Sequence, residues 1–192
     1  FTKAGYDAQV GGNIGRPALL LKQSKIKKNI VYILEVSSYQ LVYSKQFRAK
    51  HAAILNISID HLERHKSLKE YIKTKSKIFL FQKNSDFSYI NMHNQYSKNI
   101  LKIIKFYKKK RLFKLERNNF KSLLNRIKNT RINNQCNLEN IIFACKISKN
   151  FKIKNKVILN AVNNFRGLPH RQEIVFSSKK LICINDSKAT SF

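Results

Sequence analysis

Two polar segments near the end of the chain contain side chains suited to binding anions. They are Gly167-Leu168-Pro169-His170-Arg171-Gln172-Glu173 and Asn185-Asp186-Ser187-Lys188-Ala189-Thr190. Arg171 carries a planar set of donors that matches phosphate, while Asp186 and Lys188 can bind ribose hydroxyls and carboxylates. The two segments indicate a domain junction that binds anions. A loop whose charges are simply solvated would show the same pattern, so the residues alone leave both interpretations open.

A second group of residues could bind a divalent cation. Glu35 lies near the end of one apolar run, Asp60 and His61 follow the next, and Lys75 comes 14 residues after His61. In parallel α/β sheets ligands bind at the carboxyl ends of strands, which would bring these side chains together. Magnesium sites complete their shell with water and phosphate, so few protein ligands suffice. A solvated strand end at Glu35 and a helix cap at His61 are the alternative, because two ligands make a weak pattern.

The apolar pattern predicts an α/β fold with a mostly parallel sheet to position these residues. Strands are predicted at 31–36, 52–57, 88–91, 173–176 and 180–184. Helices are predicted at 17–21, 67–82, 138–148 and 156–165. Gly11 to Gly15 form a glycine-rich loop. Ser67 is predicted to cap the helix at 67–82, with Glu70 three residues later as in a capping box. The Lys-rich stretch 96–131 is predicted to form edge strands and turns.

The composition limits the class of protein. An apolar content of 43% favours a folded protein, and no apolar run reaches the roughly 18 residues that cross a bilayer. Three cysteines without metal-ligand spacing favour free thiols and a cytoplasmic location. The formal net charge of +29 predicts either a polyanion-binding surface or drift in composition, because Lys is spread along the chain beside abundant Asn and Ile. The densest run, Lys108 to Arg111, lies in no nucleic-acid-binding motif.

Read in order, the polar segments of the chain resemble the Mur ligases of peptidoglycan synthesis, in particular the branch that adds D-glutamate. The resemblance covers the full length of the chain in collinear order. The matching segments are Gly11-Gly12-Asn13-Ile14-Gly15, Leu34-Glu35-Val36-Ser37-Ser38-Tyr39-Gln40-Leu41, Asn56-Ile57-Ser58-Ile59-Asp60-His61-Leu62-Glu63-Arg64-His65, Tyr71-Ile72-Lys73-Thr74-Lys75, Asn137-Leu138-Glu139-Asn140, Leu168-Pro169-His170-Arg171 and Asn185-Asp186-Ser187-Lys188-Ala189-Thr190.

This resemblance implies an enzyme that forms an amide bond at the expense of ATP. ATP would phosphorylate the L-alanyl carboxylate of UDP-N-acetylmuramoyl-L-alanine, and the amine of D-glutamate would attack the acyl phosphate. The implied cofactors are ATP and two Mg²⁺ ions, with Lys75 carried as a carbamate. Such a reaction needs three polyanions held together while fixed cations neutralise developing charge.

The resemblance also assigns roles to individual residues. Glu35, His61 and Lys75 match the metal site, and Lys75, His61 and Lys188 are implied in catalysis. The ATP-binding positions are Asn137, Arg171 and Asp186. The positions implied for the two substrates are Asn13, Ser37, Gln40 and Thr190.

Two departures from the family pattern shape the remaining predictions. The family's nucleotide-binding loop, Gly-Thr-Asn-Gly-Lys-Ser/Thr, is not found in the chain and is expected upstream of Phe1. Cys136 stands where the family usually has His. We therefore predict a central ATP-binding domain at residues 1–166, lacking its first strand, and the start of a Rossmann-like ligase domain at 167–192. Two alternatives are a catalytically dead, basic scaffold that binds polyanions, and a sister ligase such as folylpolyglutamate synthetase.

Overall fold

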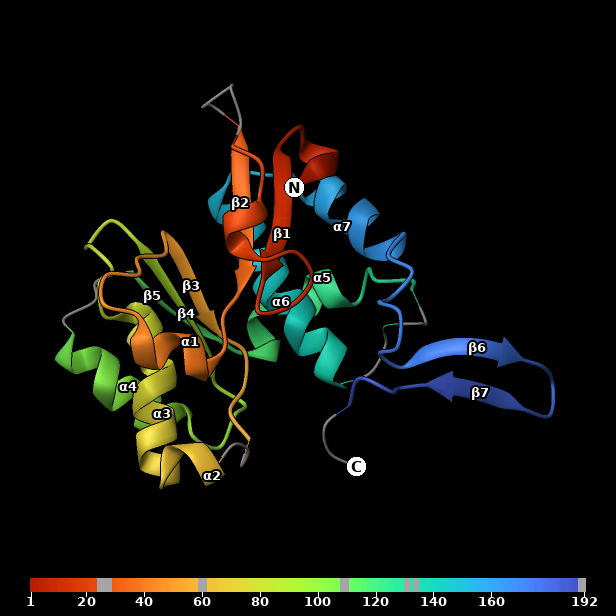
Figure 1. Ribbon diagram of the computed structural model, residues 1–192. Helices are drawn as coiled ribbons and strands as arrows, with labels where there is room; N and C mark the ends of the chain where they lie inside the picture. Colours follow the sequence, from red (N-terminus) through yellow and green to blue (C-terminus); the bar gives the residue numbers. More distant parts are fainter. Residues whose placement is uncertain (24–28, 59–61, 108–110, 130–131, 133–134, 190–192) are drawn as a thin grey trace.

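A three-stranded parallel sheet with helices on both faces forms the main body of the protein (Figure 1). The structure is a computed structural model that describes residues 1–23, 29–58, 62–107, 111–129, 132 and 135–189. The strands β3 (His51–Ile54), β4 (Phe87–Asn91) and β5 (Leu112–Leu115) lie side by side in that order. None of the helices in the described ranges combines the length and the apolar character needed to cross a bilayer.

Side chains from alternate strand positions enter two separate cores. On one face, Ile54 and Ile90 pack with residues of α3 (Leu68–Ser76) and α4 (Ser97–Phe106). That cluster is Ala52, Ile54, Ile57, Tyr71, Ile72, Phe79, Ile90, Ile100 and Ile104. Burial of both faces is the usual condition of a parallel sheet and explains the apolar runs in its strands.

The opposite face of the sheet is covered by helices from later in the chain. Tyr89 of β4 and Leu115 of β5 pack with α5 (Lys121–Leu124), α6 (Gln135–Asn150) and α7 (Asn155–Asn163). The members of this cluster are Tyr89, Leu115, Phe120, Leu123, Ile142, Phe143, Cys145, Ile158 and Leu159. Burial raises the pKa of the Cys145 thiol to about 11, so this free cysteine is a neutral core residue.

A second parallel pair stands beside this body. β1 (Asp7–Gly12) pairs with β2 (Ile30–Glu35), and β2 leads into α1 (Ser38–Tyr43). Within the described residues β2 pairs with β1, and β3 pairs with β4. The prediction of a buried strand here is wrong in part, because Tyr32 is 44% exposed and Ile33 is 40% exposed. Because the described residues show no pairing between β2 and β3, the parallel sheet is divided into two pieces.

The chain ends in an antiparallel hairpin that extends away from the body (Figure 1). It consists of β6 (Glu173–Ser177) and β7 (Ile182–Asn185). Its large apolar side chains are exposed, among them Val175 at 59%, Phe176 at 54% and Ile182 at 57%. A two-stranded sheet with its apolar side chains exposed obtains little stability from burial.

The predicted α/β class and its parallel pairing are confirmed. The helices predicted at 138–148 and 156–165 appear as α6 and α7, and the two last strands appear as β6 and β7. The helix predicted at 67–82 is α3 followed by a 3₁₀ turn, η3 (Lys77–Phe79), and the helix predicted at 17–21 is only a 3₁₀ turn, η2 (Ala18–Leu20).

The prediction of edge strands and turns for residues 96–131 is correct for β5, which is an edge strand of the three-stranded sheet, but it is wrong for residues 97–106. The strand β1 had no counterpart among the predicted strands. Residues 97–106 form the α4 helix, whose Ile100 and Ile104 lie four positions apart and enter the core. Lys98, Lys102 and Lys105 recur at helical spacing and are exposed, so α4 is an amphipathic helix with its apolar face toward the core. The short helices η1 (Thr2–Ala4), α2 (Leu62–His65) and η4 (Arg117–Phe120) complete the described elements.

Candidate functional site

The ends of β1 and β2 bring two of the predicted site residues together. Gly12 is paired with Glu35, and the backbone N–H of Asn13 donates to the carbonyl oxygen of Glu35 at 2.9 Å. Gly12 has φ +115°, and a Cβ at this position would collide with the Glu35 carbonyl oxygen. Only glycine allows this approach without strain. The glycine-rich loop therefore joins Asn13 to the exposed end of β2, where Glu35 lies.

The turn after β2 is fixed by a reciprocal cap. The Ser37 hydroxyl accepts from the Gln40 backbone N–H at 3.3 Å, and the Ser37 N–H donates to Oε1 of Gln40 at 3.0 Å. This capping box satisfies two backbone donors at the start of α1. The two residues assigned to substrate binding thus hold each other in place, a role that the sequence pattern did not reveal.

Lys75 lies on α3 next to a buried aromatic cluster. Its Nζ is 5.2 Å from the centroid of the Tyr71 ring, within cation–π range. The Tyr71 ring in turn lies 5.0 Å from the imidazole of His65. Nε2 of His65 is 2.9 Å from the Ser38 hydroxyl oxygen. A continuous set of contacts therefore connects the turn at Ser37 with the helix that carries Lys75.

The residues present fit a magnesium site only in part. Glu35 supplies a hard carboxylate oxygen at the end of β2, the type of ligand that Mg²⁺ prefers. Lys75 would become an oxygen ligand only as a carbamate. His61 lies outside the described residues. Among the residues that the structure describes, no group of three or more His, Cys, Asp or Glu side chains is placed to hold a metal ion.

Hairpin pairing joins the two polar segments near the end of the chain. Glu173 opposes Asn185 across β6 and β7. The Gln172 N–H donates to Oδ1 of Asp186 at 3.2 Å, and the Lys188 N–H donates to the His170 carbonyl oxygen at 3.1 Å. The two segments therefore form one cluster.

The backbone of this cluster is unusual. His170 has φ +62° and Gln172 has φ +48°, which are left-handed values that cost energy in residues other than glycine. These residues flank Arg171, which is exposed. Strained backbone of this kind often accompanies functional sites, since it sets the direction of a side chain. Thr190 lies outside the described residues.

Asn137 lies in the first turn of α6, whose orientation is fixed by a contact that the sequence did not reveal. Nδ2 of Asn91, at the carboxyl end of β4, donates to Oε2 of Glu139 at 2.7 Å. Asn91 is buried, with 3% of its surface exposed. The position of Asn91 at the carboxyl end of a buried strand was the signal available in the sequence.

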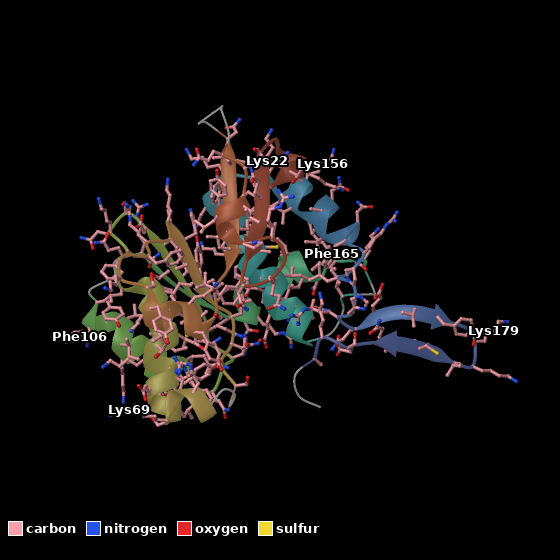
Figure 2. The ribbon with its side chains drawn as sticks, in the orientation of Figure 1. Lys22, Lys69, Phe106, Lys156, Phe165 and Lys179 are labelled. Carbon is pink, nitrogen blue, oxygen red and sulfur yellow. The ribbon has the colours of Figure 1, made fainter. Side chains whose placement is uncertain are left out.

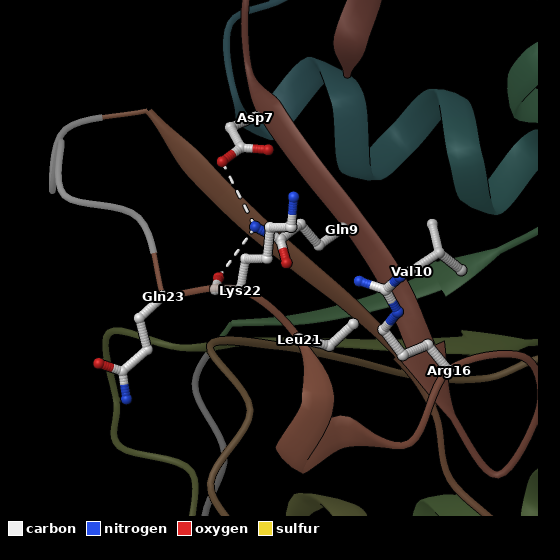
Figure 3. A pocket seen from close by; sticks show the side chains of 7 residues that line it. All are labelled: Asp7, Gln9, Val10, Arg16, Leu21, Lys22 and Gln23. Atoms are coloured by element: carbon white, nitrogen blue, oxygen red, sulfur yellow. Dashed lines mark hydrogen bonds between the residues drawn. The ribbon is translucent and has the colours of Figure 1, made fainter.

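A cavity of about 360 Å³ lies beside β1 (Figure 3). Its lining includes Asp7, Gln9 and Arg16, and Nε2 of Gln9 donates to the Lys22 carbonyl oxygen at 2.9 Å. This lining includes none of the predicted site residues. A second cavity of about 120 Å³ lies near Phe120 and Lys149 and does not include them either. The predicted site residues therefore lie outside the linings of both cavities.

The positive charge is distributed over many elements of the structure. In Figure 2, labelled lysines project outward from the loop before β2, from α3, from α7 and from the turn between β6 and β7. These residues are Lys22, Lys69, Lys156 and Lys179. These four lysines lie on separate elements and do not form one local cluster.

Comparison with known proteins identifies the class of this fold. Its described architecture is similar to the crystal structure of MurF from Acinetobacter baumannii, with a TM-score of 0.66 at 12% identity over 93% of this chain and 50% of that one. It is also similar to a structure of UDP-N-acetylmuramoyl-L-alanyl-D-glutamate–2,6-diaminopimelate ligase, with a TM-score of 0.58 at 18% identity over 79% and 35% of the two chains. At these identities the similarity establishes the fold.

Sequence comparison then establishes the family. Residues 8–162 match the Mur ligase middle domain, so the chain belongs to the Mur ligase family. Relatives named UDP-N-acetylmuramoylalanine–D-glutamate ligase are 35% identical in Rickettsia felis, over 97% of this chain, and 34% identical in Clostridioides difficile, over 100% of it. A relative of the same name in Buchnera aphidicola is 37% identical over 98% of this chain. The chain spans 44–45% of the length of these three relatives.

Proposed function

We propose that this chain is part of an ATP-dependent ligase that adds D-glutamate to UDP-N-acetylmuramoyl-L-alanine during peptidoglycan precursor synthesis in the cytoplasm. The observation that carries the proposal is the family match, together with relatives of that name that are 34–37% identical across nearly the whole chain. The placement of Asn13 against Glu35 supports it further, because both belong to the segments that resemble this branch.

The proposed reaction forms one amide bond and cleaves one phosphoanhydride bond. An oxygen of the L-alanyl carboxylate attacks the γ-phosphorus of ATP and releases ADP, which leaves an acyl phosphate. The neutral amine of D-glutamate then attacks the acyl carbon, and inorganic phosphate departs with the former carboxylate oxygen while the nitrogen loses a proton. Most of the catalytic demand is for positioning and for charge stabilisation.

The proposed metal site uses Glu35, His61 and Lys75. Bound Mg²⁺ would neutralise the charge that develops on the phosphoryl oxygens. For Lys75 we propose a carbamate, formed when its neutral amine adds to CO₂ and releases a proton. The carbamate replaces a cation with an anion, so it could bind or orient the metal. The exposed carboxylate of Glu35 supports this assignment.

The remaining roles are divided between two ends of the structure. We propose that Asn13, Ser37 and Gln40 contact the uridine nucleotide. Asn137 and Asp186 would hold the adenine and ribose of ATP, and Arg171 would face its transferred phosphate. Lys188 and Thr190 would approach D-glutamate. The link between Gln172 and Asp186 supports a shared role for the two hairpin segments.

We further propose that residues 1–166 form the central ATP-binding domain and residues 167–192 begin the next domain. The boundary follows α7 and precedes the hairpin. In the described residues β1–β2 and β3–β4–β5 are separate sheets, and one more strand paired with β2 and β3 would join them into a single parallel sheet. A strand that ends in the nucleotide-binding loop would fit there, since such loops follow a strand and open a helix.

The test is a ligation assay of the complete protein with ATP, Mg²⁺ and UDP-N-acetylmuramoyl-L-alanine. We expect product and phosphate with D-glutamate and neither with L-glutamate. Product with a folate acceptor instead would establish the sister-ligase alternative. If no acceptor reacts and the protein stays on heparin at moderate salt, the polyanion-binding scaffold would replace the proposal, because such binding weakens steeply as salt rises.

A further inference from the structure

A buried histidine–serine pair lies between the two parts of the proposed substrate and metal site. Ser38, the first residue of α1, is 2% exposed, and His65, the last residue of α2, is 3% exposed. Nε2 of His65 lies 2.9 Å from Oγ of Ser38, although the two residues are 27 positions apart. A buried polar group that loses its partner is costly, so this pair constrains how α1 and α2 can lie.

His65 also contacts aromatic rings on both sides of this pair. Its imidazole centroid is 5.0 Å from the Tyr71 ring of α3 and 6.0 Å from the Tyr39 ring of α1. Tyr71 is 3% exposed and contacts Lys75, whose Nζ is 5.2 Å from its centroid. His65 is thus packed between the helix that carries Lys75 and the helix that begins after Ser37.

We propose that His65 is a positioning residue that holds the Ser37–Gln40 cap in register with Lys75. Because His65 is buried, it acts through Ser38 and Tyr71 and does not touch the substrate. Ser37 and Gln40 bond to each other in this cap, and the Ser37 carbonyl oxygen accepts from the Leu41 N–H at 3.1 Å. The contact of the next residue, Ser38, with His65 links this cap to α2. This inference rests on the proposed ligase function, which gives Ser37, Gln40 and Lys75 their roles.

The test compares kinetic constants of variants of the complete protein. His65→Ala should raise KM for UDP-N-acetylmuramoyl-L-alanine and lower kcat/KM at least about tenfold, as expected when a misplaced group weakens transition-state contacts. KM for ATP should change less than twofold. Ser38→Ala, which removes a single oxygen and is the milder change, should show the same pattern. His65→Gln, which retains a side-chain donor and acceptor, should restore most of the lost kcat/KM.

His51 offers a matched control away from the site. Its Nδ1 lies 2.8 Å from the Tyr89 hydroxyl, so His51→Ala also removes a partly buried histidine from a hydroxyl partner. This variant should lose thermal stability while kcat/KM stays within twofold. An equal kinetic loss in His51→Ala, or an unchanged KM for the nucleotide substrate in both His65→Ala and Ser38→Ala, would overturn the proposal.

A second readout separates this inference from the proposed function. Hydrogen exchange at the amides of residues 37–41 should quicken in His65→Ala and Ser38→Ala, whether or not the protein ligates D-glutamate. Faster exchange in these two variants, together with no ligation of D-glutamate by the wild-type protein, would contradict the proposed function alone. Unchanged exchange at these amides in both variants would contradict the positioning role.

Discussion

The two polar clusters of this protein are built in opposite ways. The cluster around Glu35, Ser37 and Lys75 is supported by buried groups, including Ser38, His65 and Tyr71, each no more than 3% exposed. The cluster around Arg171 and Asp186 is supported by a hairpin whose apolar side chains remain 47–59% exposed. Burial restrains the first cluster before any ligand binds, whereas the hairpin is restrained mainly by its own hydrogen bonds. We call the cluster around Glu35, Ser37 and Lys75 the body cluster, and the cluster around Arg171 and Asp186 the hairpin cluster. We therefore expect the body cluster to be preformed and the hairpin cluster to be completed by its ligands.

The largest expected effect is on turnover at the body cluster. Glu35→Ala or Lys75→Ala in the complete protein should lower kcat at least about a hundredfold, the usual result of losing a group that stabilises developing charge. Lys73→Ala is the matched control, because Lys73 lies on the same helix and is exposed. Added acetate or formate should partly restore turnover in Lys75→Ala if the lysine acts as a carbamate. Near-normal rates would remove the residue from the site.

Truncating one isoleucine in each region should show the difference in packing. Ile142 is 2% exposed in the core, and Ile182 is 57% exposed on the hairpin. Ile142→Ala should lower the free energy of unfolding by about 2–5 kcal/mol, from lost burial and the cavity left behind. Ile182→Ala should change it by less than about 0.5 kcal/mol. Denaturant unfolding measures both, and equal losses would show that the hairpin is packed as firmly as the core.

A third comparison uses three glycines with positive φ. Gly12→Ala should lower stability by about 1–3 kcal/mol and also reduce turnover, because its Cβ would push against the Glu35 carbonyl oxygen. Gly15 has φ +67° and Gly167 has φ +89°, and a Cβ at either would meet nothing within 4 Å. Their alanine variants should lower the free energy of unfolding only by the strain of holding alanine at a positive φ, and they should leave the body cluster unchanged. Equal effects on kcat from Gly12→Ala and Gly15→Ala would contradict the close-approach argument.

The smallest expected effect is a pH dependence of stability in the body. Burial lowers the pKa of His51 from an ordinary value of 6.5 to about 4. The unfolded chain then binds the proton more readily, so stability is fully present above pH 6.5 and falls as the pH drops toward 4. Because His51 is only partly buried, we expect a loss of about 1–2 kcal/mol. His51→Gln should flatten this slope, measured by unfolding at a series of pH values.

A separate loss should follow at lower pH. A bidentate hydrogen bond from Arg48 lowers the pKa of Asp86 below its ordinary value of 3.8. Stability from this pair is present above that value and is lost as the pH falls through the lowered pKa. The His51 variant should therefore keep the loss below pH 4. A slope between pH 6.5 and 4 that survives in His51→Gln would show that another group titrates there.

The sequence predicted most of the longer elements of the fold and missed α4. The helices α6 and α7 were predicted from apolar spacing near 3.6, and the strands β6 and β7 from short apolar runs. In α4 the exposed lysines at 98, 102 and 105 and the buried Ile100 and Ile104 form an amphipathic pattern that was present in the sequence, but the high lysine content of the surrounding stretch favoured turns instead. The strand β1 has the sequence DAQVGG, which lacks the apolar run of a central strand.

For the candidate site, the sequence indicated which residues carry chemistry but not what holds them. Glu35 was predicted from its position at a strand end, and Arg171 from its planar donors within a polar segment. Nothing in their spacing could show that Ser37 and Gln40 cap each other or that His65 reaches Ser38, since these contacts depend on how α1 and α2 pack. The pairing of Glu173 with Asn185 also required the three-dimensional structure.

Hydrogen exchange of the complete protein, with and without ATP and UDP-N-acetylmuramoyl-L-alanine, tests the contrast between the two clusters most directly. We expect the amides at residues 37–41 and 71–75 to be protected already in the free protein. The amides at 170–173 and 186–189 should exchange quickly when free and gain protection only when both ligands are bound. Strong protection of the hairpin segments in the free protein, or ligand-dependent ordering of the body segments instead, would contradict the account.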